Sequence, residues 1–380
     1  MELVRSEDQE LIAKTAADFV KEKSPIARVR QLRDSSDPVG FSRALWKEMA
    51  ELGWIGIPFP ESVGGAGLGF AELAVVLEEL GRTLAPEPFL STVLLGGQAL
   101  LLAGDEAKAK DWLPRVCKGD AILALAQQET RSRYDLAAVA TRAERAGTGY
   151  RIRGEKIQVL DGHVADALVV VARTAGGPRD LEGLTLFLVP KGAGGLGVTR
   201  QIRLDGRNAA LVKLDGVEVG ADAVLGAVDG GHALLARVVD RATVGLSAEM
   251  LGGMQQAFAL TLDHLKHRQQ FGVPIGSFQA LKHRAANVYI ELELAKSAVM
   301  AAARGVDAEA PDLARLVSLA KARCSDAYVL ATNEGVQMFG GVGMTDEYDV
   351  GFYMKRARAA ELTFGDAAFH RARWAALSGY

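Results

Sequence analysis

Cysteine is scarce in this chain, which has only Cys117 and Cys324 among its 380 residues. Two cysteines so far apart, with no histidine cluster beside them, support neither a disulfide framework nor a zinc site, so no bound metal is expected. A strong charge of either sign is also missing, because the formal net charge is only −3 at pH 7. A balance so close to neutral gives no sign of a nucleic-acid partner.

A long hydrophobic run is absent as well. The most apolar stretch, residues 89–103, is shorter than the roughly 20 residues that span a bilayer, and Ser91, Gly96 and Gly97 interrupt it. We predict a buried helix there and no membrane insertion. The first residues, MELVRSEDQELIAK, are charged from Glu2 onward and have no apolar core. We therefore expect a cytoplasmic location and neither a secretory nor a mitochondrial leader.

The composition that remains is that of an ordinary globular protein, with 49% hydrophobic and 24% charged residues. At about 150 residues per domain, the length predicts two or three domains. We expect an N-terminal helical domain at residues 1–118, a central β domain at 119–225 and a C-terminal helical bundle at 226–380.

Helical patterns fill the first domain. Ser6 and Gln9 stand at the spacing of a capping box, and apolar residues recur at helical spacing over residues 41–52 and 70–80. Residues 55–69, IGIPFPESVGGAGLG, contain two prolines and several glycines, which predict an irregular segment.

The middle third changes character. Five short segments rich in Val, Ile and Leu are separated by Gly, Asp or Pro: residues 137–143, 150–159, 167–173, 184–189 and 211–219. This pattern predicts a small antiparallel sheet or barrel, with a hairpin turn near Gly147–Gly149.

Helical periodicity returns after about Gly230. One face of a long helix after Pro274 carries apolar residues at steps of four and three: Leu281, Ala285, Val288, Leu292, Ala295 and Val299. Long apolar stripes of this kind pack into helical bundles.

Two local segments are candidates for ligand binding. Arg268 follows a helical pattern and precedes a glycine-containing turn, where a planar guanidinium can grip a pyrophosphate by two parallel hydrogen bonds. Spacing alone favours the simpler interpretation, a surface arginine in a loop. Gly340 and Gly341 end another helix, where glycine serves either as a cap or as a place for a ligand to approach the backbone.

Three segments together resemble the signatures of acyl-CoA dehydrogenases, in the same order and over nearly the whole chain. They are RQQFGVPIGSFQ at residues 268–279, QMFGGVG at 337–343 with Thr345, Glu347 and Tyr348, and Gly53–Trp54 with Pro60, Glu61, Gly64 and Gly65. The resemblance implies a mainly α fold with a central β domain: an N-terminal helical domain, a small β-barrel and a C-terminal four-helix bundle. It also implies an oxidoreductase of lipid metabolism that introduces an α,β double bond into an acyl-CoA thioester.

The same resemblance implies FAD as cofactor. In the family, the positions that match Arg268, Gln270, Phe271, Gln337 and Gly341 hold the ADP half of FAD across a subunit boundary, so a homo- or hetero-oligomer is expected. The expected partners are an acyl-CoA substrate and an electron-transfer flavoprotein or similar acceptor.

The catalytic base of the family is missing. It is usually a glutamate directly before a glycine in the last stretch, where it removes the α proton of the thioester. Here that stretch reads ELTFGDA, so Phe364 occupies the base position. Some members place the base on the first helix of the bundle, but the matching position is Ala242, preceded by Asp240 and Arg241. A small shift of the alignment would bring Asp240 to that position.

The strands that face the flavin ring in the family are altered too. Gln128 and Glu129 stand where the family has Thr-Glu, and the loop TRSRY at residues 130–134 replaces a small glycine-containing loop. Gln158, Val159 and Leu160 replace a Trp-Ile-Thr segment. The ring side therefore departs from the family, whereas the ADP side keeps its pattern.

This asymmetry resembles the β-type members of actinobacterial acyl-CoA dehydrogenases, which act as heterotetramers in steroid side-chain degradation and lack the base in one subunit type. Our first hypothesis is a subunit whose paralogous partner supplies the glutamate. A second is a self-sufficient flavoenzyme that uses Asp366 as base on an acyl-CoA or on another substrate such as a nitroalkane, although a helix-capping Asp is the simpler interpretation.

A third hypothesis is a scaffolding subunit without catalysis. The histidines do not discriminate among these three, since each lies in a helical or loop context where a solvated imidazole is the default expectation: His163, His232, His264, His267, His283 and His370.

Overall fold

The computed structural model describes residues 4–380, which form two compact units. The first unit comprises the chain up to Ser35, Gly69–Ala85 and Thr243–Tyr380; the second comprises Ser36–Leu68 and Pro86–Ala242. The chain therefore passes repeatedly between the units. The division into three domains at residues 118 and 225 stays a prediction.

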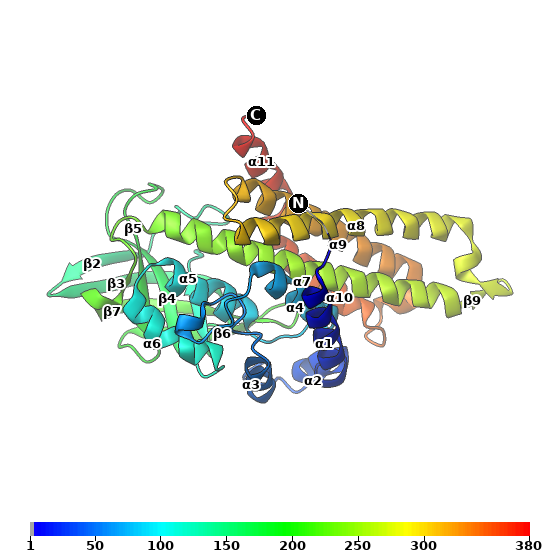
Figure 1. Ribbon diagram of the computed structural model, residues 1–380, viewed down its shortest axis with the longest axis horizontal. Helices are drawn as coiled ribbons and strands as arrows, with labels where there is room; N and C mark the ends of the chain where they lie inside the picture. Colours follow the sequence, from blue (N-terminus) through cyan, green and yellow to red (C-terminus); the bar gives the residue numbers. More distant parts are fainter. Residues whose placement is uncertain (1–3) are drawn as a thin grey trace. The chain divides into compact units, whose positions relative to one another are not determined.

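The first unit is helical (Figure 1). Its helices are α1 (Glu7–Lys23), α2 (Ile26–Asp34), α4 (Phe70–Arg82), most of α7 (Gly231–His267), α8 (Gln279–Asp307), α9 (Leu313–Phe339), α10 (Val350–Leu362) and α11 (Ala367–Leu377). Its short elements are β9 (Gln269–Gln270), β10 (Val273–Pro274) and the 3₁₀ turns η4 (Ile275–Ser277) and η5 (Gly340–Met344). The predicted return to helix after Gly230 is confirmed. Over the described residues, no helix combines the length and apolar character that crossing a membrane requires.

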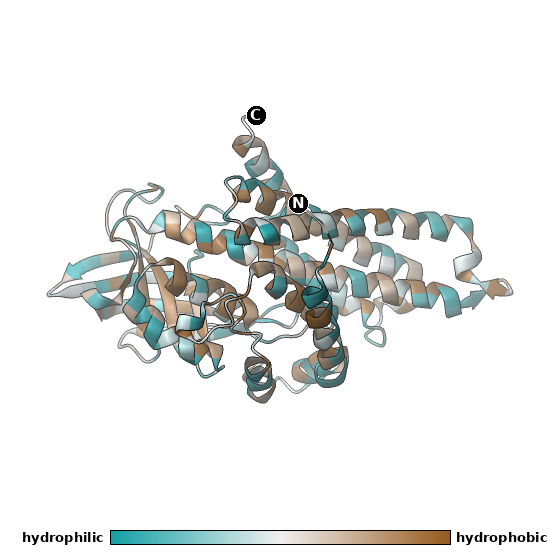
Figure 2. Cartoon of the chain, viewed as in Figure 1, coloured by the Kyte–Doolittle hydropathy of each residue, from teal (hydrophilic) through white to brown (hydrophobic). Residues whose placement is uncertain are grey.

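Two expectations for the helices of this unit are confirmed. The Ser6 hydroxyl accepts from the backbone N–H of Gln9, and the Gln9 side chain accepts from that of Ser6, both at 3.2 Å, which completes the capping box of α1. The predicted stripe of α8 faces inward, because Ala285, Val288, Leu292, Ala295 and Val299 are all buried. Figure 2 shows the matching alternation of hydrophilic and hydrophobic turns along α8.

Contacts distant in sequence hold α4 in this unit. Gly69 has no side chain with which to cap α4, and the carboxylate of Asp307 instead accepts from the N–H groups of Phe70 (2.6 Å) and Ala71 (3.0 Å). At the crossing of α4 and α7, a Cβ atom on Gly252 would lie 1.7 Å from the carbonyl oxygen of Glu78. The backbones of α4 and α7 therefore approach too closely for any side chain at residue 252.

The helices of the second unit are α3 (Arg43–Glu51), α5 (Gln98–Leu102) and α6 (Glu106–Cys117), with 3₁₀ turns η1 (Glu61–Val63) and η3 (Ala221–Ala223). The buried helix predicted over residues 89–103 is present, but it begins as a π-helix, η2 (Phe89–Gly97), and only then continues as α5. Every residue of η2 is buried.

The sheet of the second unit has eight strands: β1 (Leu123–Ala126), β2 (Arg142–Ala146), β3 (Gly149–Leu160), β4 (Ala167–Arg173), β5 (Leu184–Pro190), β6 (Leu196–Ile202), β7 (Asn208–Gly220) and β8 (Val224–Leu225). Seven follow the order β6-β7-β3-β2-β4-β5-β8, and β1 pairs parallel with β4. The predicted strands at β3, β4, β5 and β7 are confirmed, as is the hairpin turn between β2 and β3, whereas β1, β6 and β8 were not predicted.

The predicted strand at residues 137–143 is wrong, since β2 begins only at Arg142. The cause is the guanidinium of Arg173, which is fully buried. It donates to the carbonyls of Ala137, Val139, Ala175, Asp180 and Glu182 at 2.8 to 3.3 Å. A side chain therefore takes the carbonyls that residues 137 and 139 would have offered to a neighbouring strand.

Replacing this arginine should destabilise the second unit strongly. We expect Arg173→Gln to lower the free energy of unfolding by at least about 3 kcal/mol, because several buried carbonyls lose their donor. The measurement is denaturant unfolding of the variant and of a control, Arg151→Gln, which removes an exposed pair with Glu218. The control should change stability by less than about 1 kcal/mol. Equal losses in the two variants would contradict this role of Arg173.

Candidate functional site

A short hairpin follows α7. The N–H of Arg268 donates to the carbonyl of His264 (2.9 Å), and the carbonyl of Arg268 accepts from the N–H of Ile275 (2.8 Å). Strands β9 and β10 flank Phe271 and Gly272, whose φ angles of 53° and 78° are those of a type I′ turn. This turn leaves the Phe271 ring 92% exposed. In Figure 2 the tip of the hairpin is hydrophobic, next to the hydrophilic end of α7.

The end of α9 is the second segment that the sequence indicates as a candidate for ligand binding. Gln337 lies exposed in the last turn, and Gly340 ends the helix with a φ of 69°. The predicted helix end at these glycines is confirmed. A Cβ atom built on Gly341 would meet no other atom within 4 Å. The backbone at Gly341 is therefore open to a ligand.

An aromatic cluster joins these two segments. The rings of His264 and Phe339 stack with centroids 4.1 Å apart and planes 15° apart, and Tyr348 packs edge-on against both. Burial, and then the charge of Arg268, lowers the pKa of His264. The imidazole is thus neutral at pH 7 and places no second cation beside Arg268. The stack fixes the end of α7 against the end of α9, and sequence analysis missed it.

These residues fit the ADP half of FAD. Across residues 4–380, the Arg268 guanidinium has no ion-pair or side-chain hydrogen-bond partner, and it is exposed. The exposed carboxamides of Gln270 and Gln337 and the open backbone of Gly341 belong to the same hairpin and helix end. An unpaired guanidinium with amide donors is the chemistry that a pyrophosphate requires.

The segment between α10 and α11, residues 363–366, contains Phe364, which we predicted to occupy the base position of the family. Phe364 has a φ of 61°, in the left-handed region that costs a bulky residue about 1 to 3 kcal/mol. Gly365 has a φ of 121°, and a Cβ atom there would lie 2.4 Å from the Phe369 ring. Asp366 caps α11, because its carboxylate accepts from the N–H of Phe369 at 2.8 Å. This contact supports the capping interpretation of Asp366.

Two buried bases hold this segment in place. The ammonium of Lys321 donates to the carbonyls of Glu361 (2.9 Å) and Gly365 (2.7 Å) and to the Ser325 hydroxyl (3.2 Å). Burial lowers the pKa of Lys321 to about 7. The Nε2 atom of His370 lies 3.1 Å from the carbonyl of Phe364, to which it donates. The strained conformation at residue 364 is thus imposed by its surroundings.

The expectation that the histidines are solvated is wrong for three of them. His370 is 1% exposed, and burial followed by the charge of Lys321 lowers its pKa to about 3. His264 stacks on Phe339, and His163 is half-buried with Nε2 at 3.1 Å from the carbonyl of Val39. Spacing gave no signal for these contacts, because each partner lies on another element.

The alternative base position on α7 offers no carboxylate. Ala242 is fully buried. The neighbouring Arg241 donates to the side-chain oxygen of Gln98 at 2.7 Å, and Asp240 is half-buried. Residue 242 therefore presents a buried methyl group, which cannot accept a proton.

In the second unit, Glu129 has a structural role, because its carboxylate is fully engaged by neighbouring donors. Its carboxylate accepts from the ammonium of Lys156 (2.7 Å) and from the N–H groups of Ala140 (2.7 Å) and Thr141 (3.0 Å). Burial alone would raise the pKa of Glu129, but the charge and hydrogen bonds of these partners lower it below its usual value. Glu129 is thus an ionised anchor for the loop that follows it.

Residues 158–160, which we predicted to replace the Trp-Ile-Thr segment of the family, lie at an irregularity in β3. The register with β7 shifts between Lys156 and Val159, and Gln158 in between has a φ of 53°. Its side chain is exposed, whereas Val159 and Leu160 are buried. A bulge of this kind re-aims one side chain out of a strand, so Gln158 is the residue of this segment available to a ligand.

Family models for the three domains of acyl-CoA dehydrogenases match almost the entire chain. The N-terminal domain model matches residues 6–120, the middle domain model 124–217 and the C-terminal domain model 229–377. The chain belongs to the acyl-CoA dehydrogenase family, whose members are oxidoreductases and FAD flavoproteins.

Relatives cover the chain from end to end. Mitochondrial isovaleryl-CoA dehydrogenase from Pongo abelii is 30% identical over 96% of this chain and 87% of its own. A chain of the ChsE4–ChsE5 complex from Mycobacterium tuberculosis has a TM-score of 0.89 and 28% identity, covering 100% of this chain and 99% of its own. A variant of the Tcur3481–Tcur3483 steroid ACAD has a TM-score of 0.86 and 30% identity, covering 98% of both chains.

Titration of His370 should link stability to pH. Below its usual pKa of 6.5 the unfolded chain takes up a proton at this imidazole, whereas the folded chain does so only near 3, so stability falls as the pH falls through that window. At pH 5 the expected loss is about 2 kcal/mol. The variant His370→Gln keeps a donor for the carbonyl of Phe364 but cannot titrate, and urea unfolding at pH 7.5 and 5 should show a smaller loss for it. Identical losses would contradict the assignment.

Proposed function

We propose that this chain is a flavin-holding subunit of an acyl-CoA dehydrogenase whose paralogous partner supplies the catalytic carboxylate. The feature that supports the proposal is Phe364, an apolar ring where the resemblance places the base of the family. The nearby carboxylates have other roles, since Asp366 caps α11 and Glu361 pairs with Arg358. The carboxylates beside Phe364 thus already have other partners, which supports a base supplied by another chain.

The proposed division of labour follows from the chemistry of the reaction. FAD, when bound, accepts the hydride that leaves the β carbon of the thioester. The α proton must go to a carboxylate, and a phenyl ring cannot take it. This chain would contribute Arg268 to the pyrophosphate, with Gln270, Gln337 and the backbone of Gly341 as further donors. These groups would serve the active site of the partner, which keeps its own glutamate.

Assembly with another chain is supported by the hairpin after α7. Phe271, Val273 and Phe278 are exposed there, and the rings of Phe271 and Phe278 lie 6.0 Å apart. An apolar patch at the tip of a rigid hairpin is a surface that a partner would cover. The two solved structures reported above, ChsE4–ChsE5 and Tcur3481–Tcur3483, are each named for two proteins. Such names fit assembly from two different subunits.

The substrate we propose is an acyl-CoA thioester, with a steroid side chain as the acyl group, since the Tcur3481–Tcur3483 protein is a steroid ACAD. The electron acceptor we propose is an electron-transfer flavoprotein or a similar carrier. A scaffolding role without catalysis would instead require that neither the chain nor its complex binds flavin.

Co-expression with a paralogue that keeps the Glu-Gly pair tests the division of labour. We expect the chain alone to reduce flavin with acyl-CoA slowly or not at all, and the complex to turn over. In the complex, Asp366→Asn should leave turnover unchanged, because asparagine preserves the helix cap while removing the acid. Full activity of the chain alone, lost in Asp366→Asn, would establish Asp366 as the base and reject the partner hypothesis.

Arg268 should set the affinity for FAD. Removing one charge-assisted donor to the pyrophosphate costs about 1.5 to 3 kcal/mol, so Arg268→Gln is expected to weaken FAD binding about tenfold or more. The measurement is the dissociation constant from flavin fluorescence in the complex. Arg323→Gln is the matched control, since Arg323 pairs with Glu291 on the surface of the same unit, and it should leave the constant unchanged. Unchanged binding in both variants would remove Arg268 from the site.

A further inference from the structure

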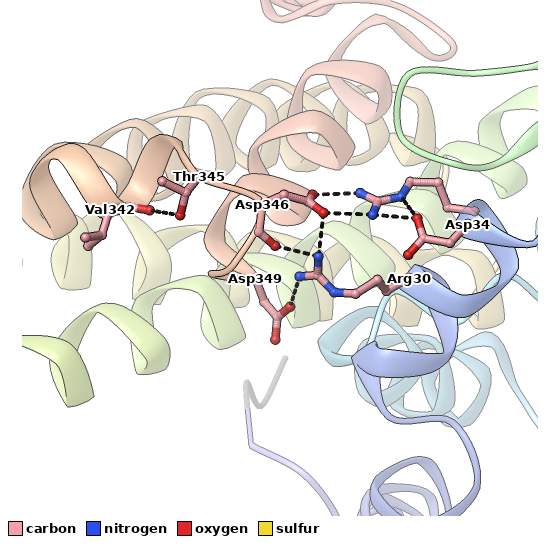
Figure 3. Close-up of polar contacts among 7 residues, drawn as sticks. Arg30, Asp34, Val342, Thr345, Asp346 and Asp349 are labelled. Atoms are coloured by element: carbon pink, nitrogen blue, oxygen red, sulfur yellow. Dashed lines mark hydrogen bonds and ion pairs between the residues drawn. The ribbon is translucent and has the colours of Figure 1, made fainter.

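Two arginines of α2 grip the segment that follows the glycines of α9 (Figure 3). Arg33 reaches both carboxylate oxygens of Asp346, at 2.7 and 2.8 Å. Arg30 donates to one of these oxygens at 2.8 Å, to the backbone carbonyl of Asp346, and to the carboxylate of Asp349 at 2.9 Å. We refer to Arg30, Arg33, Asp346 and Asp349 as the arginine clasp.

The clasp is more than a pair of surface charges. An isolated exposed ion pair is worth little, but here one guanidinium engages its carboxylate with two parallel donors and a second shares the same carboxylate. The ring of Phe352 lies beneath both guanidinium groups, 4.7 Å from Arg30 and 5.0 Å from Arg33. The hydrogen bonds from Arg33 lower the pKa of Asp346 to about 2. The clasp is therefore intact at any pH near neutral.

The clasp is one of two anchors for the segment between α9 and α10. On the α9 side, Phe339 stacks on His264, and Tyr348, which lies beyond the turn between Asp346 and Asp349, packs edge-on against both rings. Between these anchors runs the turn Gly340–Met344, which contains three glycines and the open backbone of Gly341. Thr345 adds a local contact, since its hydroxyl donates to the carbonyl of Val342 at 2.7 Å (Figure 3).

A glycine-rich turn has many conformations to lose on binding, so a ligand that binds its backbone gains affinity when the turn is already ordered. The aromatic cluster contacts both ends of the turn, through Phe339 and Tyr348, whereas the clasp holds only the end that follows Met344. The aromatic cluster is uncharged at pH 7, whereas the clasp is ionic and lies near the surface, where the side chain of Asp346 is 61% exposed. Dissolved salt should therefore weaken the second anchor and spare the first.

We propose that Arg30 and Arg33 are positioning residues for the ADP half of FAD, acting through Asp346 and Asp349 on the backbone of the Gly340–Met344 turn. The proposal rests on the flavin site described under the proposed function. It makes α2 part of the cofactor site although neither arginine belongs to the family signatures. Flavin affinity then depends on ionic strength through the chain itself, beyond the direct effect of salt on the pyrophosphate.

The test is the dissociation constant for FAD, measured by flavin fluorescence on the FAD-loaded complex at about 0.05 M and 0.5 M salt. At low salt we expect the double variant Arg30→Gln/Arg33→Gln to bind FAD about five- to tenfold more weakly than wild type, as the loss of a bidentate network implies. High salt should narrow this difference. Arg33→Lys, which keeps the charge but not the two parallel donors, should fall between the two.

Arg151→Gln is the matched control, because Arg151 is another exposed arginine with two donors on one carboxylate, in the other unit. It should leave FAD affinity unchanged. An unchanged melting temperature in Arg33→Lys, together with weaker FAD binding, would separate positioning from general destabilisation. Equal FAD affinity in wild type and the double variant at low salt would overturn the proposal.

FAD binding by the wild-type complex distinguishes rejection of the clasp from failure of the proposed flavin site. If wild type binds FAD and the double variant matches it, only the role of the clasp is rejected. If Arg268→Gln also leaves FAD binding unchanged, the proposed flavin site fails. Hydrogen exchange of the peptide covering residues 340–349 gives an independent readout, since the double variant should exchange faster there than wild type and Arg151→Gln should not.

Discussion

The buried ammonium of Lys321 is the interaction on which the arrangement of α9, α10 and α11 depends. Its three donors meet three acceptors, the Ser325 hydroxyl and the carbonyls of Glu361 and Gly365, so the charge is fully hydrogen-bonded. The lysine thereby fixes where α10 ends and how the chain enters α11. None of these contacts is made to the side chain of residue 364, so the hydrogen bonds that hold the segment do not involve the Phe364 ring.

Both units bury a cation by the same means. Arg173 in the sheet and Lys321 in the bundle are surrounded by backbone carbonyls, and neither forms an ion pair with a carboxylate in the described chain. A buried charge is costly unless hydrogen bonds satisfy it, and several carbonyl dipoles can do so. Each cation binds one or more carbonyls of a segment that lies outside the helices and strands, and so fixes the conformation of that segment. The irregular segments around Arg173 and Lys321 are therefore held by specific hydrogen bonds.

Periodicity in the sequence predicted the elements whose residues contact local neighbours in a repeating way. The apolar stripe of α8 is of this kind. The strand β4 was predicted from its run of Leu and Val instead, since all seven of its residues are buried and do not alternate. The strand β1, LALA, was missed because it is only four residues long and has no β-branched residue, and β2 was misplaced because the Arg173 side chain takes carbonyls of the preceding segment. Family motifs located Arg268 and Gln337, but no motif indicated His264, which brings them together. Contacts between residues of distant elements produce no local pattern in the sequence from which they could be predicted.

The stack of His264 on Phe339 has a consequence for how this protein can evolve. The two rings lie 4.1 Å apart on different helices, and each stands a few residues from a group that we assign to the cofactor. A larger or charged residue at either position would push one helix end away from the other and separate Arg268 from Gln337. Residues 264 and 339 therefore cannot vary independently, and among relatives that retain flavin their substitutions should occur in matched pairs.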